Sequence, residues 1–548
     1  MKLLWIDLNC SYSHSSLALP ALHAQLMHRN AIEWEVVRTT IGEQPGVVAS
    51  AISMCHPDVV AATAWLFTHE QLLHIVTRVK ALLPQVTVIL GGPEFLGDNE
   101  NYMRSHPEVN CVLRGEGELS FSRWVNVWDT PSQWHIVEGL CYMYGGNYHD
   151  GGWARNMQFD AMKAPECSPF FVWNKPFVQL ETTRGCFNTC AFCVSGAGDP
   201  VRLLDVDTIR QRLDHICERG IRDVRILDRT FNSNPSRAIA LLELFETYHS
   251  KLRFHLEIHP ALLPHAVRKV LASLPRGLLH LEAGIQSLRQ EVLDCSLRKG
   301  TLQQTLDGLR FLCSLPNVAT HADLIAGLPQ YTLKQLYEDI CTLVEYSVDE
   351  LQIESLKLLP GTVMRHRAEE WGIRYSPLPP YEVLHTDSID SVELQEARRL
   401  SRLIDAYYNT PAWQQITRRL ILGEETFLHH FLGYLTEHNY IDQPMSLERR
   451  GEILYQYCCD NYSQYVTDVT VAWVEAGMSL KKRPAEKVRT KRMKPPVKWE
   501  IIYGEYVPSL RLCFLPIDAD HGLWFGYDTT SQCPTPIFKA WGKQESVG

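Results

Sequence analysis

Three cysteines lie close together in the segment Glu181-Thr-Thr-Arg-Gly-Cys186-Phe-Asn-Thr-Cys190-Ala-Phe-Cys193. The segment follows an apolar run over 177–182, for which we predict a β-strand. A loop at the end of a strand can turn three thiolates toward one face of a cubane iron–sulfur cluster, and such clusters normally take four cysteine ligands. This loop has no fourth cysteine, so a cluster held here would keep one iron open, as catalytic metal sites keep a vacant position. We therefore predict Cys186, Cys190 and Cys193 as ligands of an iron–sulfur cluster.

Two other interpretations of these cysteines remain open at this point. Each could be an unrelated core residue, because free cysteine is often buried, although three at this spacing argue against it. The three could also bind zinc. Zinc would need a fourth ligand such as His215 or His255, and nothing in the spacing motivates either.

Length and charge limit the class of protein. The chain has 548 residues, and at roughly 150 residues per domain this suggests about three or four domains. Hydrophobic residues make up 45% and charged residues 21%, so a globular protein is expected rather than a disordered one. The net charge of −10 argues against a protein that coats nucleic acid, since such proteins are usually basic. Nucleic acid is therefore not an expected partner.

Cysteine content and apolar runs indicate the compartment. The 16 cysteines are too sparse for a secreted disulfide scaffold. Asp7 interrupts the N-terminal apolar run too early for a signal peptide, and we find no apolar stretch of about 18 residues to span a membrane. We expect a cytoplasmic protein with no membrane partner, in a reducing compartment where clustered cysteines usually bind metal.

Residues 1–130 alternate strand-like and helix-like stretches, which predicts an α/β domain with a doubly wound parallel sheet. Ligands of such sheets bind at the carboxyl ends of the strands. Residues 131–175 have few strong signals, and we interpret them as a linker with a small hairpin. The strands are expected at Leu3–Leu8, Glu33–Val37, Pro57–Thr63, Thr87–Leu90 and Asn110–Leu113.

Residues 176–375 alternate again and predict a partial (βα)6 barrel of the TIM type. His255, Glu257 and His259 share one face of the third strand, and we expect them to point inward while the apolar residues between them meet helices. Residues 376–548 predict a third domain, mixed but mostly helical. The six barrel strands are expected at Phe177–Thr182, Val224–Asp228, Phe254–Ile258, Leu278–Ala283, His321–Ile325 and Glu350–Glu354.

The cysteine spacing after the first strand of a partial barrel resembles the radical S-adenosylmethionine (SAM) superfamily. The resemblance implies a 4Fe-4S cluster whose open iron binds SAM, and reductive cleavage of SAM to a 5′-deoxyadenosyl radical. Phe192 is the aromatic residue of that signature. Segments after the later strands are similar to those with which the superfamily holds SAM. The residues to which the resemblance assigns SAM binding are Phe192, Asp228, Glu257, Glu282, Gln286, Arg298 and Gly327.

Two glycine-rich segments mark strand ends in the N-terminal domain, Gly91-Gly92-Pro93-Glu94 and Arg114-Gly115-Glu116-Gly117-Glu118. Taken alone, they are more simply interpreted as ordinary tight turns than as an approach to a bulky cofactor. Together with the cysteine motif they resemble the cobalamin-binding domain of a large radical SAM subgroup. The Asp-x-His-x-x-Gly motif of many cobalamin domains does not occur after the first strand, so no histidine from that motif is expected below cobalt. The candidate cobalamin contacts are Ser13, Trp65, Gly91, Gly92, Glu94, Gly115 and Glu116.

The resemblance implies an enzyme that methylates an unactivated carbon of an unknown substrate, with an electron donor of the flavodoxin or ferredoxin type. A non-methylating rearrangement or cyclisation with the same cofactors is the alternative. An iron–sulfur RNA-associated binding protein, using the basic segment 481–494, is the alternative of another class. The tail from about residue 376 resembles an uncharacterised domain that often ends such proteins.

Overall fold

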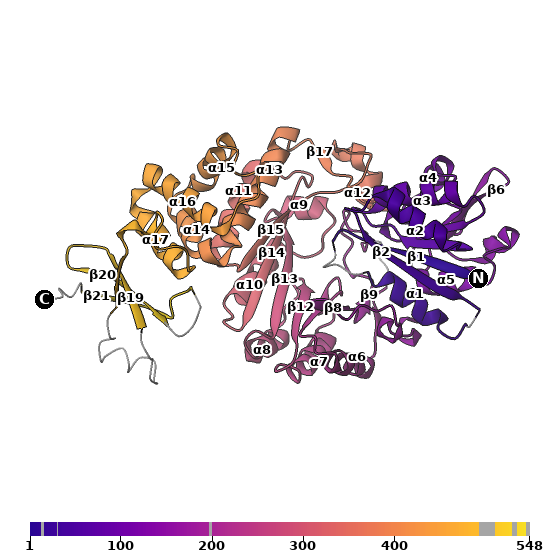
Figure 1. The fold of residues 1–548 in the computed structure, drawn as a ribbon, viewed down its shortest axis with the longest axis horizontal. Helices are drawn as coiled ribbons and strands as arrows, with labels where there is room; N and C mark the ends of the chain where they lie inside the picture. The colour runs from indigo at the N-terminus through magenta and orange to yellow at the C-terminus, as the bar shows by residue number, and fades with distance from the viewer. Residues whose placement is uncertain (12–15, 30, 197–199, 493–509, 529–533, 544–548) are drawn as a thin grey trace. The chain divides into compact units, whose positions relative to one another are not determined.

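The computed structural model describes residues 1–11, 16–29, 31–196, 200–492, 510–528 and 534–543. The chain divides into two compact units (Figure 1). The first unit comprises residues 1–336 and 354–394, and the second comprises residues 337–353 and 395–548.

The N-terminal sheet of the first unit has seven strands in the order β2-β1-β3-β4-β5-β6-β7. Its first five strands are parallel, as the sequence predicts, and this order places the reversal of winding between β1 and β3. The segment interpreted as a linker supplies β6 and β7, a hairpin that extends the sheet antiparallel to β5. The bounds are β1 Lys2–Asn9, β2 Glu33–Thr40, β3 Val59–Thr63, β4 Thr87–Gly91, β5 Cys111–Leu113, β6 Leu140–Tyr144 and β7 Asn147–Asp150.

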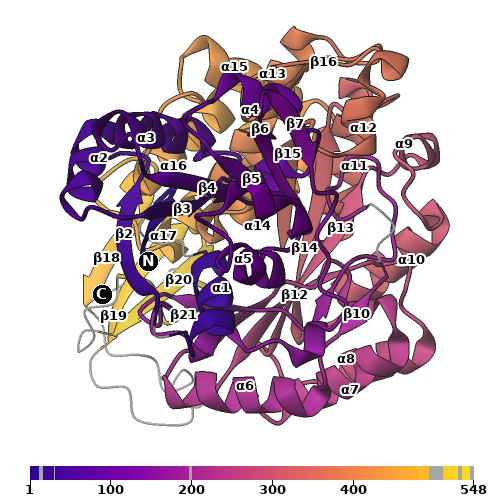
Figure 2. The same cartoon turned by 90° about the vertical axis from the view of Figure 1, so that its right-hand side faces the viewer.

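Helices cover both faces of this sheet (Figure 2). Two helices pack on one face, where Phe121 and Trp124 join the buried side chains of β1 and β3. The others pack on the opposite face, with Ile52 and Val76 at the centre of a second apolar layer. Burial of both faces explains why β3 is apolar from Val59 to Ala62 and buried along its whole length. The first pair is α1 Ala18–Leu26 and α5 Gly117–Trp124, and the others are α2 Pro45–Met54, α3 His69–Leu82 and α4 Glu100–Ser105.

A second sheet has the order β15-β14-β13-β12-β11-β8, and its strands lie where the sequence predicts the six barrel strands. The pairs from β8 to β14 are parallel. The boundary between the two units falls within β15. The bounds are β8 Phe177–Leu180, β11 Asp223–Ile226, β12 Arg253–Ile258, β13 Leu279–Gln286, β14 Val318–Ala326 and β15 Glu350–Ser355.

One face of this sheet is buried under helices. Phe254, Leu256 and Ile258 of β12 alternate with polar residues and pack against the helices in one apolar cluster. The helices are α6 Val206–Glu218, α7 Pro235–Glu246, α8 His265–Ser273 and α10 Leu302–Cys313, and the shorter α9 spans Gln290–Cys295. The prediction that His255, Glu257 and His259 share the other face holds for His255 and Glu257, which are half-buried between fully buried neighbours. His259 follows the end of β12 and is buried, with its Nε2 3.0 Å from the Lys299 carbonyl oxygen.

The first unit ends with a short segment after the barrel, which contains α12 Val363–His366 and the antiparallel pair β16 Arg374–Tyr375 and β17 Val383–His385. Two further helices cross the boundary between the units, α11 Leu333–Glu345 and α13 Ser391–Leu403.

The second unit is helical with a small antiparallel sheet, as the prediction of a mixed, mostly helical tail anticipates. Trp413 and Trp473 lie at its core with ring centroids 6.4 Å apart. The basic segment 481–494 leads into the first strand of the sheet, and its last two residues lie outside the described chain. The elements are α14 Pro411–Gly423, α15 Phe427–Glu437, α16 Leu447–Asn461, α17 Val466–Glu475, β18 Arg489–Arg492, β19 Leu510–Pro516, β20 His521–Asp528 and β21 Phe538–Lys543.

Within the described ranges, none of the helices combines the length and the apolar character that crossing a bilayer requires.

Candidate functional site

The three cysteines lie on one loop between two short strands, β9 Thr183–Arg184 and β10 Arg202–Leu203. Gly185 opens the loop with a φ of +94°, a backbone conformation that glycine adopts without strain. Cys190 is buried, whereas Cys186 and Cys193 are half-buried, and all three thiols are free. An iron–sulfur cluster requires free cysteine sulfurs as ligands, and this loop at the end of β8 supplies three of them. The residues present therefore fit such a cluster.

Each of the three sulfurs receives one N–H donor. The amide of Asn188 lies 3.4 Å from Cys186 Sγ, and the amide of Ser195 lies 3.4 Å from Cys193 Sγ. Cys190 Sγ instead faces Nη1 of Arg298 at 3.6 Å. Burial raises the pKa of the Cys190 thiol, and the charge of Arg298 opposes that rise. The loop therefore carries donors suited to negatively charged sulfur.

Asp228, at the end of β11, holds the chain just before the cysteines. Its carboxylate accepts hydrogen bonds from the amides of Thr182 and Thr183 at 2.7 and 2.8 Å, and from the Thr182 hydroxyl. The side chain is 1% exposed. Burial raises the pKa of Asp228 and these hydrogen bonds oppose the rise. The prediction that Asp228 binds SAM stays a prediction, but the carboxylate already has three protein donors.

A second segment, at the end of α9, is joined to the cysteine loop by hydrogen bonds. The amide of Ala191 donates to the Ser296 carbonyl at 2.8 Å. The amide of Lys299 donates to Asn188 Oδ1 at 3.0 Å, and its Nζ donates to the Phe187 carbonyl at 2.7 Å. The cysteine loop is therefore fixed from two sides, by β11 and by the segment 296–299.

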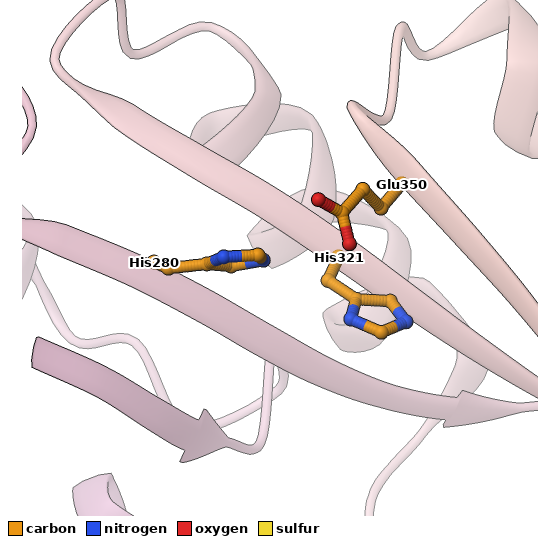
Figure 3. A group of neighbouring side chains, drawn as sticks. All are labelled: His280, His321 and Glu350. Atoms are coloured by element: carbon orange, nitrogen blue, oxygen red, sulfur yellow. The ribbon is translucent and has the colours of Figure 1, made fainter. Parts of the chain in front are cut away.

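The uncovered face of the second sheet carries a network of histidines and carboxylates. Nε2 of His255 lies 2.7 Å from Glu282 Oε2, and Nε2 of His321 lies 3.1 Å from Asp323 Oδ1. Burial raises the pKa of Glu257 to about 7, against the opposing charge of Arg229. Figure 3 shows the rings of His280 on β13 and His321 on β14, whose centroids are 6.0 Å apart. Glu350, also labelled there, begins β15 at the boundary between the units.

These polar side chains mark the inside of the sheet as a site rather than a core. Barrel interiors without a ligand are usually filled by layers of branched apolar residues. Buried polar groups lower stability unless they are paired, and this network is paired internally. The inner face of β12, β13 and β14 therefore suits a polar ligand.

The other residues predicted to bind SAM lie near the carboxyl ends of the strands or in the cysteine loop. Gln286 ends β13 with a φ of +71°, and Gly327 follows β14 with a φ of +92°. Phe192 is half-buried between Ala191 and Cys193. Their roles stay predictions, and their placement at one edge of the sheet is compatible with them.

At the carboxyl edge of the N-terminal sheet, two glycines are required by the protein's own packing. A Cβ on Gly92 would lie 2.7 Å from the Ala64 carbonyl oxygen, and one on Gly115 would lie 2.4 Å from the Ala154 carbonyl oxygen. Both have positive φ, +107° and +97°. The fold thus accounts for these two glycines without a ligand, and their contact with cobalamin stays a prediction, as does that of Gly91 at the end of β4.

Two aromatic rings are exposed on the loop after β3. Trp65 is 40% exposed and Phe67 is 58% exposed, at the edge where ligands of such sheets bind. A large planar cofactor with apolar faces would cover them, so this edge fits cobalamin. Ser13, the remaining candidate contact, lies outside the described residues.

Glu116 joins the N-terminal domain to the cysteine loop. Its two oxygens lie 2.5 and 2.9 Å from the guanidinium of Arg202. Nη1 of Arg184, two residues before Cys186, lies 3.3 Å from Glu116 and 2.9 Å from Glu118. Burial alone would raise the pKa of Glu116, but the two guanidinium groups hold it below its usual value. Sequence reasoning missed this role, because the arginines are distant in the chain.

Glu94 also has a hydrogen-bond partner that is distant in the sequence. Its buried carboxylate accepts a hydrogen bond from the hydroxyl of Tyr381, in the segment that follows the barrel. His69 of α3 lies 3.8 Å from the same carboxylate. The predicted contacts of Glu94 and Glu116 with cobalamin stay predictions, and both carboxylates have protein partners.

Comparison with known families assigns three successive segments of the chain to three family models. Residues 180–340 match the family model of the radical SAM superfamily, and residues 8–125 match that of the B12 binding domain. Residues 369–473 match a domain of unknown function, DUF4080. The cysteine loop and the barrel sheet define a radical SAM enzyme, with a 4Fe-4S cluster and SAM as cofactors. The chain therefore carries both a radical SAM domain and a B12 binding domain, whose family implies cobalamin as a further cofactor.

Three similar proteins illustrate the match. An uncharacterized methyltransferase of Pyrococcus horikoshii is 26% identical over 341 residues, which are 58% of this chain and 70% of that protein. The cobalamin-dependent radical SAM methyltransferase TokK of Streptomyces tokunonensis is 22% identical over 359 residues. These are 60% of this chain and 52% of TokK, so the chain spans about half the length of that relative. The solved structure of OxsB, a cobalamin-dependent SAM radical enzyme with aqua-cobalamin and SAM bound, has a TM-score of 0.60 at 14% identity. It covers 87% of this chain and 81% of its own.

Proposed function

We propose that this chain is a cobalamin-dependent radical SAM methyltransferase that methylates an unactivated carbon of a polar substrate. One observation carries the proposal. Glu116, at the carboxyl edge of the B12 binding domain, is bonded to Arg202 and Arg184, which flank the cysteine loop. The edge that suits cobalamin and the loop that suits the cluster are thus fixed to each other, and transfer between two cofactors requires such proximity. The names of two similar proteins, both methyltransferases, support the same activity.

When bound, the cluster and SAM supply a carbon radical that abstracts hydrogen, and cobalamin supplies the carrier of the methyl group. The chain's own residues position these groups. Cys186, Cys190 and Cys193 would hold the cluster, while Asp228 fixes the strand end before them. Trp65 would cover one face of the corrin ring. The network around His255 and Glu282 would bind polar atoms of the substrate.

The reductant is proposed by class only. A low-potential electron carrier of the flavodoxin or ferredoxin type would supply the electron. Arg184 and the cysteine loop lie at the junction between the N-terminal domain and the barrel sheet, both within the first unit.

Anaerobic reconstitution followed by cofactor analysis tests the proposal. We expect about four irons per chain, bound corrin, and 5′-deoxyadenosine formed on reduction in the presence of SAM. A variant with Cys186→Ala should lose the iron and the 5′-deoxyadenosine but keep the corrin. The matched control is Cys217→Ala, a half-buried cysteine on α6 outside the loop.

Product masses separate methylation from a rearrangement. Methylation adds one CH2 to a substrate and releases S-adenosylhomocysteine, whereas a rearrangement or cyclisation does neither. Formation of 5′-deoxyadenosine without S-adenosylhomocysteine, when candidate polar substrates are turned over, would contradict the methyltransferase. A chain that takes up no corrin would contradict it as well.

A further inference from the structure

The N–H donor that faces one of the three cysteine sulfurs differs in kind from the donors that face the other two. Cys186 and Cys193 face the backbone amides of Asn188 and Ser195, which every substitution at those two positions other than proline keeps. Cys190 faces the side chain of Arg298, whose Nη1 lies 3.6 Å from the sulfur. Among the described residues, the most buried of the three sulfurs is therefore the one that faces a cationic side chain, while Lys299 donates to a backbone carbonyl of the loop.

The position of the guanidinium is determined by the fold. Its Nη2 donates to the carbonyl of Gly284 on β13, and its own amide donates to the Leu293 carbonyl at 3.0 Å. The next residue, Lys299, is bonded to Asn188 of the cysteine loop. Both arms of the guanidinium thus have partners, one on the sheet and one on sulfur.

Gly284 is an independent sign that this contact is built into the fold. A Cβ at this position would lie 3.4 Å from Nη2 of Arg298 and 2.8 Å from Nε2 of Gln286. The φ of Gly284 is not in the left-handed region, so the backbone does not call for glycine here. A methyl group here would displace the end of the Gln286 side chain and would touch the guanidinium at an ordinary contact distance, so Gly284 lies directly beside Arg298.

We propose that Arg298 sets the reduction potential of the iron–sulfur cluster by donating a charge-assisted hydrogen bond to Cys190 Sγ. The inference rests on the proposed function, because it requires the cluster. Hydrogen bonds to the sulfurs and nearby charge are two of the factors that determine such potentials. A positive donor stabilises the reduced cluster, which carries one more negative charge, and this raises the potential. The effect is strong because Cys190 is shielded from water.

This role differs from the SAM contact that the sequence predicts for Arg298. A residue that only binds SAM would leave the potential of the SAM-free cluster unchanged. A residue that donates to the sulfur changes it whether or not SAM is present. The two roles are therefore separated by measurements without SAM.

The experiment compares the reconstituted full chain with Arg298→Met, Arg298→Lys and Gly284→Ala, in redox titrations followed by electron paramagnetic resonance without SAM. We expect Arg298→Met to lower the ratio of reduced to oxidised cluster at fixed potential about tenfold, which is about 59 mV for a one-electron couple. Arg298→Lys keeps the charge and should show a smaller shift. Gly284→Ala keeps Arg298 but displaces Gln286 beside it and brings a methyl group against its Nη2, so it should shift the potential in the same direction by much less than Arg298→Met.

The control is Lys269→Met, which removes one positive charge from an exposed position on α8. It should leave the potential unchanged. If Arg298→Met leaves the potential unchanged and only weakens binding of SAM, the proposal is overturned in favour of the SAM contact. If Arg298→Met does not take up iron, the Arg298→Lys and Gly284→Ala titrations decide in the same way. Wild-type chain that holds the cluster but forms no methylated product would contradict the proposed function and leave this inference standing.

Discussion

The hydroxyl of Tyr381 donates a hydrogen bond to the carboxylate of Glu94, across 287 residues of sequence. Glu94 belongs to the glycine-rich turn after β4 of the B12 binding domain, and Tyr381 belongs to the segment after the barrel strands. Arg365 of that segment lies with its guanidinium 4.5 Å from the centre of the Tyr381 ring. Burial raises the pKa of Glu94, and the hydrogen bond and Arg365 oppose the rise. The Glu94 carboxylate thus joins the B12 binding domain to the segment that follows the barrel, both within the first unit.

Removal of the Tyr381 hydroxyl should weaken this contact measurably. Tyr381→Phe leaves the buried carboxylate of Glu94 without its donor, which typically costs about 1–3 kcal/mol. We expect a lower urea midpoint of unfolding and a lower corrin content after reconstitution. Tyr375→Phe, in β16 of the same segment, is the control and should change both by much less. Equal midpoints for the two variants would contradict a structural role for the Glu94 contact.

The sequence alone predicts much of the fold and less of the site. Alternating and continuous apolar runs locate β1 to β5 and all six barrel strands, because one or both faces of those strands are buried. The linker assignment differs from the structure because β6 and β7 are short, and their pairing with β5 is set by tertiary contacts. The partners of Glu94, Glu116 and Asp228 leave no local pattern. The nearest of them, His69 beside Glu94, is 25 residues away along the chain, so composition and spacing carry no trace of these contacts.

Asp228 should prove necessary for retention of the cluster. Asp228→Asn removes the negative charge to which the amides of Thr182 and Thr183 donate, and it replaces the oxygen that accepts from the Thr182 hydroxyl by an NH2 group that cannot accept. Each lost buried hydrogen bond costs about 1–3 kcal/mol, and the strand end before the cysteines loosens. We expect fewer irons per chain and a lower thermal midpoint.

Asp223→Asn is the matched control for this variant, because Asp223 is exposed at the start of the same strand. It should keep the wild-type iron content. Full iron content in Asp228→Asn would show that the cysteine loop does not depend on this carboxylate.

The salt bridge between Glu116 and Arg202 should show strong coupling. Arg202 is 9% exposed, so Glu116→Gln leaves its buried charge without a carboxylate and should destabilise the chain by about 3–5 kcal/mol. Arg202→Met should destabilise it less, because Glu116 keeps Arg184 as a partner. The double variant should recover part of that loss. A double-mutant cycle on urea denaturation measures the coupling, and a value of about 0.5–3 kcal/mol is expected for residues in one network. Strictly additive effects would mean that the two groups do not interact.

Glu257 gives the chain a pH dependence of known sign. Burial raises its pKa to about 7 in the folded chain, while an unfolded glutamate has a pKa of about 4.3. The folded state thus binds the proton more tightly, and the contribution to stability is present below pH of about 4.3 and is lost as pH rises through about 7. We expect the urea midpoint to fall across that interval because of this group. Glu257→Gln should remove that part of the fall, whereas Glu243→Gln, exposed on α7, should retain it. The same pH profile in Glu257→Gln as in the wild type would assign the fall to other groups and show that Glu257 ionises normally on the inner face of the barrel sheet.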